Sequence, residues 1–502
     1  MVNCKGGLVT VDKNLKILLL NLPSPPYQTL WRESAGGFGT AISSNPRWKE
    51  SSKTPLIPFF PYASSILLKE GYEFKVVDCQ RLHLSNDQSV KMVKKENPDI
   101  IFSIISLPSM KNDLEILDEI KESIPTVKTV GVGTVCRVLS QEVLLRSKID
   151  VVLRSGYPYI TNMIELIQAF QQSRDLKTVK GISFVKNRQI LATSGPTETN
   201  FNDLPKPCYD VIPLDGYETF LDKNGEQFPY IAVLDSIGCP YNCIYCPYPL
   251  GFGREYTYRP VKLVADEIEE LYTRFNIRAF DFRSQAFAYN RKRALEICKE
   301  LMQRKLDIRW MCESRVDELN RELLETMKKA GCQRIHFGVE TGDPKILKIA
   351  KPGVKLETTE KAFKITKELS ILRQAHIILG WPDDDYRTLE NTRKFILKLE
   401  PDIINLNFLT PYPGTRMYKI ARENSLILTY NWSNYTSYTV VMRTKTLNAN
   451  ELYAIKKRII RDFSKQKLKQ LLLQKDFPTV KKPQIFINKA KTLVNKIILP
   501  QC

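Results

Sequence analysis

The 502-residue sequence lacks any unbroken run of the roughly 18 apolar residues that a membrane-spanning helix requires. Its longest apolar run near the start, residues 15–22, is interrupted by Lys16 and Asn21 and leads directly into Pro23. Because no small-residue cleavage site follows, we interpret this run as a buried strand and not as a secretory signal peptide. The sequence therefore predicts a protein that does not span a membrane.

The sequence also lacks the cysteine pattern of a disulfide-bonded protein. It contains 11 cysteines, an odd number, and eight of them stand alone in the chain. Without a secretory signal, such a set indicates free thiols in a reducing compartment. We therefore predict a cytoplasmic protein, in which the remaining three cysteines, Cys239, Cys243 and Cys246, form a cluster with a separate role.

Acidic residues are in short supply relative to basic ones. The chain has 55 Asp and Glu against 75 Lys and Arg, a formal net charge of +20. Half of this excess lies in residues 451–502, which hold 13 Lys and Arg but only 3 Asp and Glu. Such an excess points to a polyanionic partner or an anionic surface, although it says nothing about the fold.

The basic region contains a predicted amphipathic helix at 451–473, in which Leu452, Ile459 and Phe463 recur at helical spacing between lysines. A second segment, 485–499, also mixes apolar residues with lysines. Such a helix packs on the rest of the protein with its basic face in solvent, lies on an anionic membrane, or binds RNA. No RNA-binding module is present, so nucleic acid is not favoured. A peripheral contact of 451–502 with the inner face of the membrane stays open.

What the sequence has in quantity is ordinary globular composition, with 43% apolar and 26% charged residues. In the first 200 residues, strand-like runs alternate with helical patterns, which predicts a doubly wound parallel sheet. The predicted strands are 16–21, 74–78, 99–103, 127–131 and 150–153, and the predicted helices are 61–70, 87–96, 113–123 and 160–172. Residues 24–57 break this alternation with Gly, Ser and Pro and predict an irregular insertion.

A second alternation follows a connector at 180–230, which contains two short hairpin-like strands, 181–185 and 189–192. Six parallel strands with helical crossovers predict an open, partial barrel, short of the eight strands needed for closure. The strands are predicted at 231–235, 277–283, 308–315, 334–340, 374–381 and 403–409, and the helices at 264–275, 291–304, 320–330, 358–370 and 387–399.

These patterns predict an α/β protein in four parts. They are a Rossmann-like domain (1–200), a linker (201–230), a partial (β/α)6 barrel (231–430) and a basic helical C-terminal region (431–502). Catalytic groups of such barrels gather at the carboxyl ends of the strands. The three clustered cysteines follow the first barrel strand and therefore fall at that end.

The cysteine cluster has the spacing Cys239-x3-Cys243-x2-Cys246, which brings three thiolates to one short loop. Thiolates are the ligands of iron–sulfur clusters, and three of them leave one iron of a four-iron cluster without a protein ligand. Two alternatives remain: three inert buried cysteines, or a zinc site, which would need a fourth Cys or His from elsewhere in the chain.

This motif, with Tyr245 before its last cysteine, resembles the signature of the radical S-adenosylmethionine (SAM) superfamily. The resemblance implies that Cys239, Cys243 and Cys246 hold a [4Fe–4S] cluster whose fourth iron is chelated by SAM, with Tyr245 near the adenine. It also implies that an electron from the cluster cleaves SAM to a 5′-deoxyadenosyl radical. Further blocks are similar to those of the subclass that carries an N-terminal cobalamin-binding-type domain; they are 310–316, 327–332, 337–342, 378–383 and 410–415.

Three further residues are candidates for contact with SAM. Arg315 and Glu340 end the third and fourth barrel strands, on the same mouth as the cysteines. A guanidinium suits the SAM carboxylate, and a carboxylate suits its ribose or amino group, although the two side chains could instead pair with each other. After the second strand, relatives carry paired aspartates where this chain has Ser284 and Gln285. We expect the Gln285 carbonyl to serve as an acceptor there.

The N-terminal domain departs from the cobalamin-binding pattern. Family members that bind cobalamin through a lower histidine carry Asp-x-His-x-x-Gly, whereas this chain has Gln80 at the histidine position, two residues after Asp78. His83 is read as a surface residue. We therefore expect cobalamin either to bind without a histidine ligand or to be absent.

Together, the resemblance implies a radical SAM transferase that methylates an unactivated carbon or forms a C–C bond there. We expect an isoprenoid- or hopanoid-type lipid as substrate and a ferredoxin- or flavodoxin-like protein as electron donor. The alternative enzyme uses the same radical on a peptide, a tetrapyrrole or RNA without cobalamin. The alternative outside enzymes is a zinc- or cluster-bearing binding protein.

Overall fold

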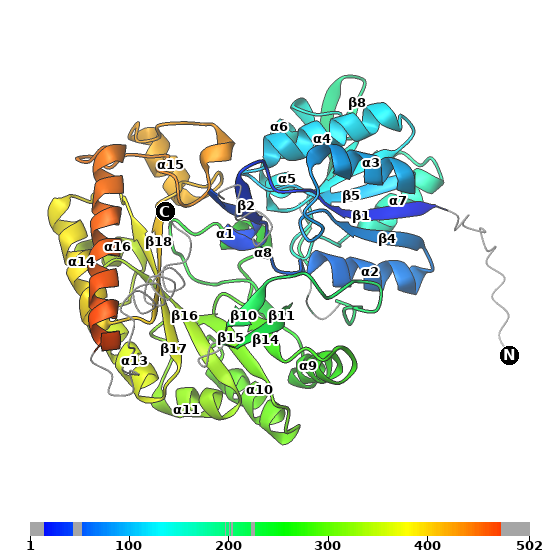
Figure 1. Cartoon of the computed structure of the whole chain (residues 1–502). Helices are drawn as coiled ribbons and strands as arrows, with labels where there is room; N and C mark the ends of the chain where they lie inside the picture. The colour runs from blue at the N-terminus through cyan, green and yellow to red at the C-terminus, as the bar shows by residue number, and fades with distance from the viewer. Residues whose placement is uncertain are drawn as a thin grey trace, which may run out of the picture. The chain divides into compact units, whose positions relative to one another are not determined.

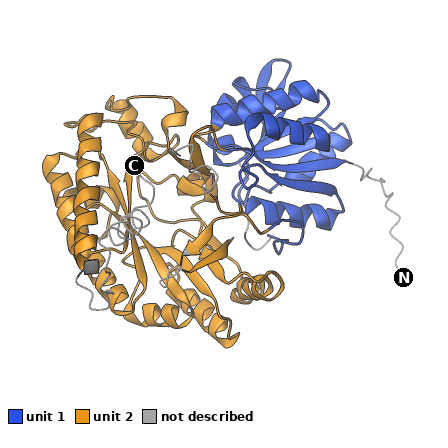
Figure 2. Cartoon of the chain, in the orientation of Figure 1, with its two compact units in different colours: residues 1–23, 57–106, 110–213 blue, residues 24–56, 107–109, 214–502 orange. Residues whose placement is uncertain are grey.

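The computed structural model of the chain describes residues 15–43, 53–195, 197–199, 201, 204–221 and 226–472. The chain divides into two compact units, coloured separately in Figure 2. Unit 1 comprises residues 1–23, 57–106 and 110–213, and unit 2 comprises residues 24–56, 107–109 and 214–502. The boundaries predicted at 200, 230 and 430 stay predictions, and the predicted segment 485–499 lies outside the described residues.

Unit 1 is built on a seven-stranded sheet in the order β4-β1-β5-β6-β7-β8-β9. The first five strands are parallel, and β8 and β9 extend the sheet as an antiparallel hairpin. The strands are β1 (Lys16–Asn21), β4 (Glu73–Asp78), β5 (Ile100–Ile104), β6 (Lys128–Val132), β7 (Val151–Leu153), β8 (Ile182–Lys186) and β9 (Gln189–Ala192).

Helices cover both faces of this sheet, with α2 and α4 on opposite sides of it in Figure 1. All five residues of β5 are buried, as expected for a central strand covered on both faces. The doubly wound fold predicted from the sequence is confirmed. Its helices are α2 (Phe59–Glu70), α3 (Asn86–Glu96), α4 (Met110–Ser123), α5 (Thr134–Val138), α6 (Ser140–Leu145), α7 (Met163–Gln171) and the 3-10 helix η2 (Leu176–Thr178).

Unit 2 contains a second seven-stranded sheet, in the order β10-β11-β14-β15-β16-β17-β18. Its last six strands are parallel and form the predicted partial barrel, while β10 pairs antiparallel with β11. The strands are β10 (Thr219–Leu221), β11 (Gln227–Val233), β14 (Ala279–Phe282), β15 (Arg309–Ser314), β16 (Cys332–Glu340), β17 (Leu372–Leu379) and β18 (Ile403–Phe408).

The long helices that connect the barrel strands pack on the outer face of this sheet (Figure 1), as the contact of the Phe337 ring in β16 with the Phe363 ring in α13 illustrates. Residues at alternate positions therefore face the barrel interior. The helices are α8 (Tyr248–Phe252), α9 (Val261–Phe275), α10 (Arg291–Gln303), α11 (Arg321–Lys329), α12 (Pro344–Ala350), α13 (Leu356–Glu368), α14 (Tyr386–Leu399), α15 (Arg416–Glu423), the 3-10 helix η4 (Trp432–Asn434) and α16 (Ala449–Leu472).

Two short ribbons complete unit 2. The first, β2 (Gln28–Trp31) and β3 (Thr40–Ser43) with α1 (Ser34–Gly37) between them, occupies the segment predicted as irregular. The second, β12 (Ser236–Ile237) and β13 (Thr257–Tyr258), flanks the cysteine cluster on both sides in sequence. The sequence did not predict them because β2 and β3 lie in a segment interrupted by Gly, Ser and Pro, and because the two residues of β12 or β13 are too few to show an alternating pattern.

Helix α16 is the predicted amphipathic helix, and its apolar face is buried. Leu452, Ile459 and Phe463 are at most 1% exposed. Against α14, the Gln466 side chain donates a hydrogen bond to the Leu397 carbonyl at 2.8 Å. Of the three sequence alternatives for this helix, packing on the barrel is the one that residues 451–472 adopt.

The cations of α16 divide between its two faces. Lys456 is buried, with its ammonium 5.0 Å from the centre of the Phe408 ring, whereas Lys457, Arg461 and Lys465 are exposed. No helix within the described ranges is both long and apolar enough to cross a bilayer.

Candidate functional site

The three clustered cysteines lie in the loop between β12 and α8, just past the carboxyl end of β11. The loop begins at Gly238, whose φ is +83°; a Cβ there would lie 1.8 Å from the Glu255 carbonyl oxygen, so only glycine fits. Two backbone hydrogen bonds shape the loop. The Cys239 amide donates to the Gly253 carbonyl, and the Cys246 amide donates to the Cys243 carbonyl.

All three cysteines are free thiols. Cys239 is 9% exposed, and Cys243 and Cys246 are half-buried. Burial raises the pKa of each thiol, and Cys243 raises the pKa of both of the others further. The three side chains therefore lie within electrostatic reach of one another, and binding a metal centre requires them to lose their protons.

In the described part of the chain, no three His, Cys, Asp or Glu side chains converge tightly enough to hold a single metal ion. A cubane cluster places each thiolate on a different iron, so it requires a wider spacing than one ion does. Three free, neighbouring thiols on one short loop are the donor set that such a cluster takes.

Glu340 closes β16 at the same barrel mouth, in a strained backbone. Its φ is +64°, unusual for a residue with a side chain, and the register with β17 shifts between Gly338 and Glu340. The Lys351 ammonium lies 3.0 Å from the Glu340 carboxylate and donates to the Gly338 carbonyl at 2.6 Å. A Cβ at Gly338 would lie 2.4 Å from both charged groups. The glycine thus makes room for a buried ion pair, both partners being at most 5% exposed.

Tyr245 connects the cysteine loop to this ion pair. Its hydroxyl lies near enough to the Glu340 carboxylate to be affected by its charge, and its ring meets the Trp381 ring edge to face at 5.2 Å. Burial, followed by the charge of Glu340, raises the pKa of Tyr245 well above its usual value. The hydroxyl is therefore held in its protonated, hydrogen-bond-donating form.

Arg315 lies at the end of β15 and is 8% exposed. Its guanidinium binds Asp317 through two hydrogen bonds, at 3.0 and 2.8 Å, and lies 3.8 Å from the centre of the Tyr241 ring. The Tyr241 hydroxyl donates to Glu318 at 2.8 Å. Arg315 is thereby fixed beside the cysteine loop, because Tyr241 belongs to the cysteine motif.

The structure decides one alternative raised from the sequence. Arg315 and Glu340 do not pair with each other, because the first binds Asp317 and the second binds Lys351. Sequence reasoning missed Asp317, Lys351 and the stacking role of Tyr241. The spacing of Tyr241 between two motif cysteines is a signal that could have revealed it, whereas the other two are partners only through the fold.

Gln285 lies in the turn that follows β14, at the barrel mouth, and is half-buried. The neighbouring Ser284 is 2% exposed, and its hydroxyl has no hydrogen-bond partner among the described residues. The chain therefore carries two neutral polar groups at this mouth.

The inner face of the barrel below the mouth is polar. His376 lies between Gln374 and Asn405, at 3.2 and 3.4 Å from their side-chain nitrogens, and its ring centre is 5.6 Å from that of His336. Burial lowers the pKa of both imidazoles, so they are neutral. The buried His336 Nε2 and Asn407 Oδ1 have no hydrogen-bond partner among the described residues. This face is thus equipped for hydrogen bonding rather than for hydrocarbon.

In unit 1, buried polar groups gather where β1, β4, β5 and β7 end. Asn21 donates to Asp78 at 2.8 Å and to Gln80 at 3.1 Å. The hydroxyls of Ser103 and Ser155 and the Asn21 Oδ1 are buried without a hydrogen-bond partner among the described residues. The carboxyl edge of a doubly wound sheet is where such folds bind ligands, and unpaired buried polar atoms fit a ligand there.

Two predicted features of unit 1 can now be placed. Gln80 is held by Asn21 and is not aimed outward as a ligand. His83 is exposed, in agreement with its interpretation as a surface residue.

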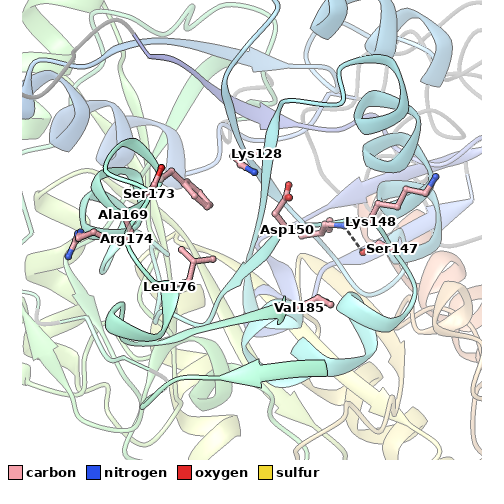
Figure 3. A pocket seen from close by; sticks show the side chains of 11 residues that line it. Lys128, Ser147, Lys148, Asp150, Ala169, Ser173, Arg174, Leu176 and Val185 are labelled. Carbon is pink, nitrogen blue, oxygen red and sulfur yellow. Dashed lines mark hydrogen bonds between the residues drawn. The ribbon is translucent and has the colours of Figure 1, made fainter. Parts of the chain in front are cut away.

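A pocket of about 550 Å³ in unit 1, shown in Figure 3, lies at the opposite end of the strands. Lys128 and Asp150, which precede or begin their strands, line it, so it is separate from the carboxyl-edge groups.

Six parallel strands with three thiols at their carboxyl ends define a partial-barrel enzyme that is built around an iron–sulfur cluster. The family model described as "Radical SAM superfamily" matches residues 233–396. An uncharacterized methyltransferase of Pyrococcus horikoshii is 30% identical over 441 residues, which cover 87% of this chain and 90% of that protein. The chain therefore belongs to the radical SAM superfamily and is an enzyme of that superfamily, whose cofactors are a [4Fe–4S] cluster and SAM.

Two further similarities bear on the subclass. The anaerobic magnesium-protoporphyrin IX monomethyl ester cyclase of Cereibacter sphaeroides is 26% identical, over 83% of this chain and 66% of that protein. The solved structure of OxsB, a cobalamin-dependent SAM radical enzyme with aqua-cobalamin and SAM bound, is 16% identical with a TM-score of 0.70. That match covers 96% of this chain and 72% of OxsB, and it confirms the two-part fold.

Proposed function

We propose that this enzyme methylates an unactivated carbon, or forms a C–C bond there, with a [4Fe–4S] cluster held by Cys239, Cys243 and Cys246. The observation that carries the proposal is the barrel mouth itself. There, the three-thiol loop brings Tyr245 within electrostatic reach of the buried Glu340–Lys351 pair. When bound, the cluster and SAM together supply a 5′-deoxyadenosyl radical; everything else at this mouth binds and orients.

Four side chains would hold SAM. Arg315 has two of its nitrogens on Asp317, which leaves Nη1 for the SAM carboxylate. Glu340, held by Lys351, would accept from the ribose hydroxyls or the amino group, and the Tyr245 ring would lie along the adenine. Gln285 would accept from the amino group through its amide oxygen. Because Glu340 is already fixed by the buried Lys351, and Arg315 by its two hydrogen bonds to Asp317, little side-chain entropy is lost on binding.

Cobalamin would bind at the carboxyl edge of the unit 1 sheet. The unpaired polar atoms of Asn21, Ser103 and Ser155 fit a hydrogen-bonding ligand there. Because Gln80 is held by Asn21, cobalamin would bind without a protein ligand to its metal from this position. The fold similarity to OxsB, whose structure contains aqua-cobalamin, supports this assignment.

For the substrate, the isoprenoid- or hopanoid-type lipid suggested by the sequence stays a prediction. A second candidate class is a tetrapyrrole, as the name of the Cereibacter sphaeroides relative suggests. The polar inner face of the barrel favours the second class, because neutral imidazoles and carboxamides bind polar substituents better than hydrocarbon.

The decisive experiment is anaerobic reconstitution of the full chain with iron and sulfide, followed by metal analysis and an assay of SAM cleavage by dithionite. The wild type is expected to hold about four irons per chain and to cleave SAM. Cys239→Ala should lose both. Cys208→Ala, at a half-buried free cysteine of unit 1, is the matched control and should lose neither. Equal iron content and cleavage in wild type and Cys239→Ala would refute the proposal, and bound zinc would favour a binding protein.

Cobalamin has a separate test. Wild-type protein incubated with hydroxocobalamin should retain the corrin absorbance through gel filtration. Ser103→Ala, which removes only the hydroxyl of this fully buried residue, should weaken retention. A colourless wild-type protein would remove cobalamin from the proposal and leave the radical chemistry in place.

Analysis of cell extracts distinguishes the two candidate substrate classes. A strain that lacks the enzyme should lose one methylated compound from its lipid extract if the substrate is an isoprenoid, or from its pigment extract if it is a tetrapyrrole. Unchanged profiles of both extracts would exclude both classes.

A further inference from the structure

A small apolar pocket of about 110 Å³ adjoins the cysteine loop in unit 2. Ile244, which stands between Cys243 and Cys246, is one of its walls, and Trp381 is another. The rest of the apolar wall comes from Pro382 and from α12 and α15, which contribute Ile346, Ile349, Met417 and Ile420. The Met417 amide donates to the Ile244 carbonyl at 2.9 Å, so α15 is tied directly to the loop.

The surface around this pocket is strongly basic. Helices α12 and α15 expose five cations, Lys345, Lys348, Arg416, Lys419 and Arg422, and a single acid, Glu423. At the rim, Lys445 pairs with Asp383 at 2.6 Å and adds no net charge. Ile349 is 43% exposed beside the pocket. Glu423 pairs with Lys419 at 3.8 Å, so the other four cations are in excess. An exposed apolar spot surrounded mainly by basic side chains has the character of a protein-binding surface.

From these observations we infer that the α12–α15 face is the docking surface for an acidic one-electron donor protein. The inference rests on the proposed function, since it takes the cysteine loop to hold the cluster. The charge of the surface selects an acidic partner, because complementary potentials steer encounter and fix orientation. The position of the pocket beside the cysteine loop then indicates that the partner donates electrons. A protein seated over Ile244 lies next to Cys243 in the chain and two residues from Cys246, and electron transfer requires that proximity to the cluster ligands.

The electron balance of the step is simple. The reduced donor gives up one electron and is oxidised, the cluster held by the loop gains that electron, and no bond forms or breaks in the transfer. The donor class is a low-potential flavin or iron–sulfur protein with a negative surface. Nothing on the α12–α15 face acts as a catalytic residue; its cations position the donor.

The test measures binding of a recombinant acidic flavodoxin to the reconstituted full-length enzyme by calorimetry, at low and moderate ionic strength. For the wild type, we expect the Kd to rise with salt. The triple variant K345E/K348E/R416E should bind about tenfold or more weakly and should lose most of that salt dependence. The matched control reverses three exposed lysines on α9 and α10, K262E/K292E/K299E, and should bind as the wild type does.

A parallel assay of SAM cleavage separates the docking surface from the chemistry. Driven by dithionite, which needs no docking, the wild type and both triple variants should cleave SAM equally. Driven by reduced flavodoxin, only K345E/K348E/R416E should be slow. Equal flavodoxin affinity and salt dependence in the two triple variants would overturn the docking surface. Failure of dithionite to drive cleavage in the wild type would instead overturn the proposed function.

Discussion

At the scale of single residues, the barrel mouth depends on buried charges that are each paired. Glu340 and Lys351 are at most 5% exposed, and each is the other's ion-pair partner. Removing one partner leaves an uncompensated buried charge, which costs far more than removing both. Such a pair fixes the orientation of Glu340 while its backbone is held at a φ of +64°.

We therefore predict that Lys351→Met destabilises the protein by about 3 kcal/mol, measured by urea denaturation. The double variant Glu340→Gln/Lys351→Met, which removes both charges, should recover a large part of that loss. If the double variant were as unstable as the sum of its two single variants, the pair would not be coupled as described.

Asp384 shows how burial alone can change the state of a carboxyl group. It is 1% exposed and accepts hydrogen bonds from the Gly380 and Trp381 amides and the Thr388 hydroxyl. Burial outweighs these bonds and raises the pKa of Asp384 to about 7. The folded state then binds a proton that the unfolded state has released, so this group's contribution to stability falls as pH rises from about 4 to about 7.

The corresponding prediction compares the wild type with Asp384→Asn at pH 5 and pH 7.5. The wild type should lose about 2 kcal/mol more free energy of unfolding than the variant over this interval, because the variant has no proton to release. Denaturant titrations at the two pH values measure the difference. Parallel pH dependence in the two proteins would contradict the raised pKa of Asp384.

At the scale of helices and strands, the two sheets were predictable and the small ribbons were not. The sequence predicts every parallel strand of both units to within a few residues, because apolar strand-like runs alternate regularly with amphipathic helices. The β2–β3 hairpin was not predicted because it lies within residues 24–57, where Gly, Ser and Pro interrupt that alternation. The partners of Arg315 and Glu340 escaped because Asp317 and Lys351 acquire their roles from the turn and from the bulge, and no spacing encodes them.

Helix α16 illustrates the same limit. Its sequence is equally typical of a membrane-surface helix, and only the fold shows that its apolar side packs on the barrel. We predict that Phe463→Ala, at a fully buried position, costs about 3 kcal/mol of stability. Lys465→Ala, two residues along on the exposed side, should change the stability by less than about 0.5 kcal/mol. Comparable losses in thermal or urea denaturation of the two variants would contradict the packing of α16.

At the scale of the whole molecule, the basic excess no longer has a single explanation. Part of it lies on the exposed side of α16, part surrounds the pocket beside the cysteine loop, and part lies in residues 473–502, beyond the described chain. Because the apolar side of α16 is buried, this helix is not available to insert into a membrane. The membrane contact predicted for 451–502 is therefore left as a prediction for residues 473–502 alone.

This reassignment leads to a truncation experiment. A chain that ends at residue 472 keeps α16 and should fold, bind iron and cleave SAM as the full chain does. If residues 473–502 contact an anionic membrane, the full chain should co-sediment with phosphatidylglycerol vesicles at low salt and the truncated chain should not. Equal pelleting of the two chains would argue against a membrane role for these residues.

The central claim is that three cysteines at the mouth of a partial barrel hold a four-iron cluster with one iron open to SAM. Electron paramagnetic resonance of the reconstituted, dithionite-reduced protein tests it most directly. The account predicts a reduced-cluster signal that changes shape when SAM is added and that is lost in Cys239→Ala. A signal that SAM leaves unchanged would contradict the open iron, and a signal that persists in Cys239→Ala would contradict the ligand set.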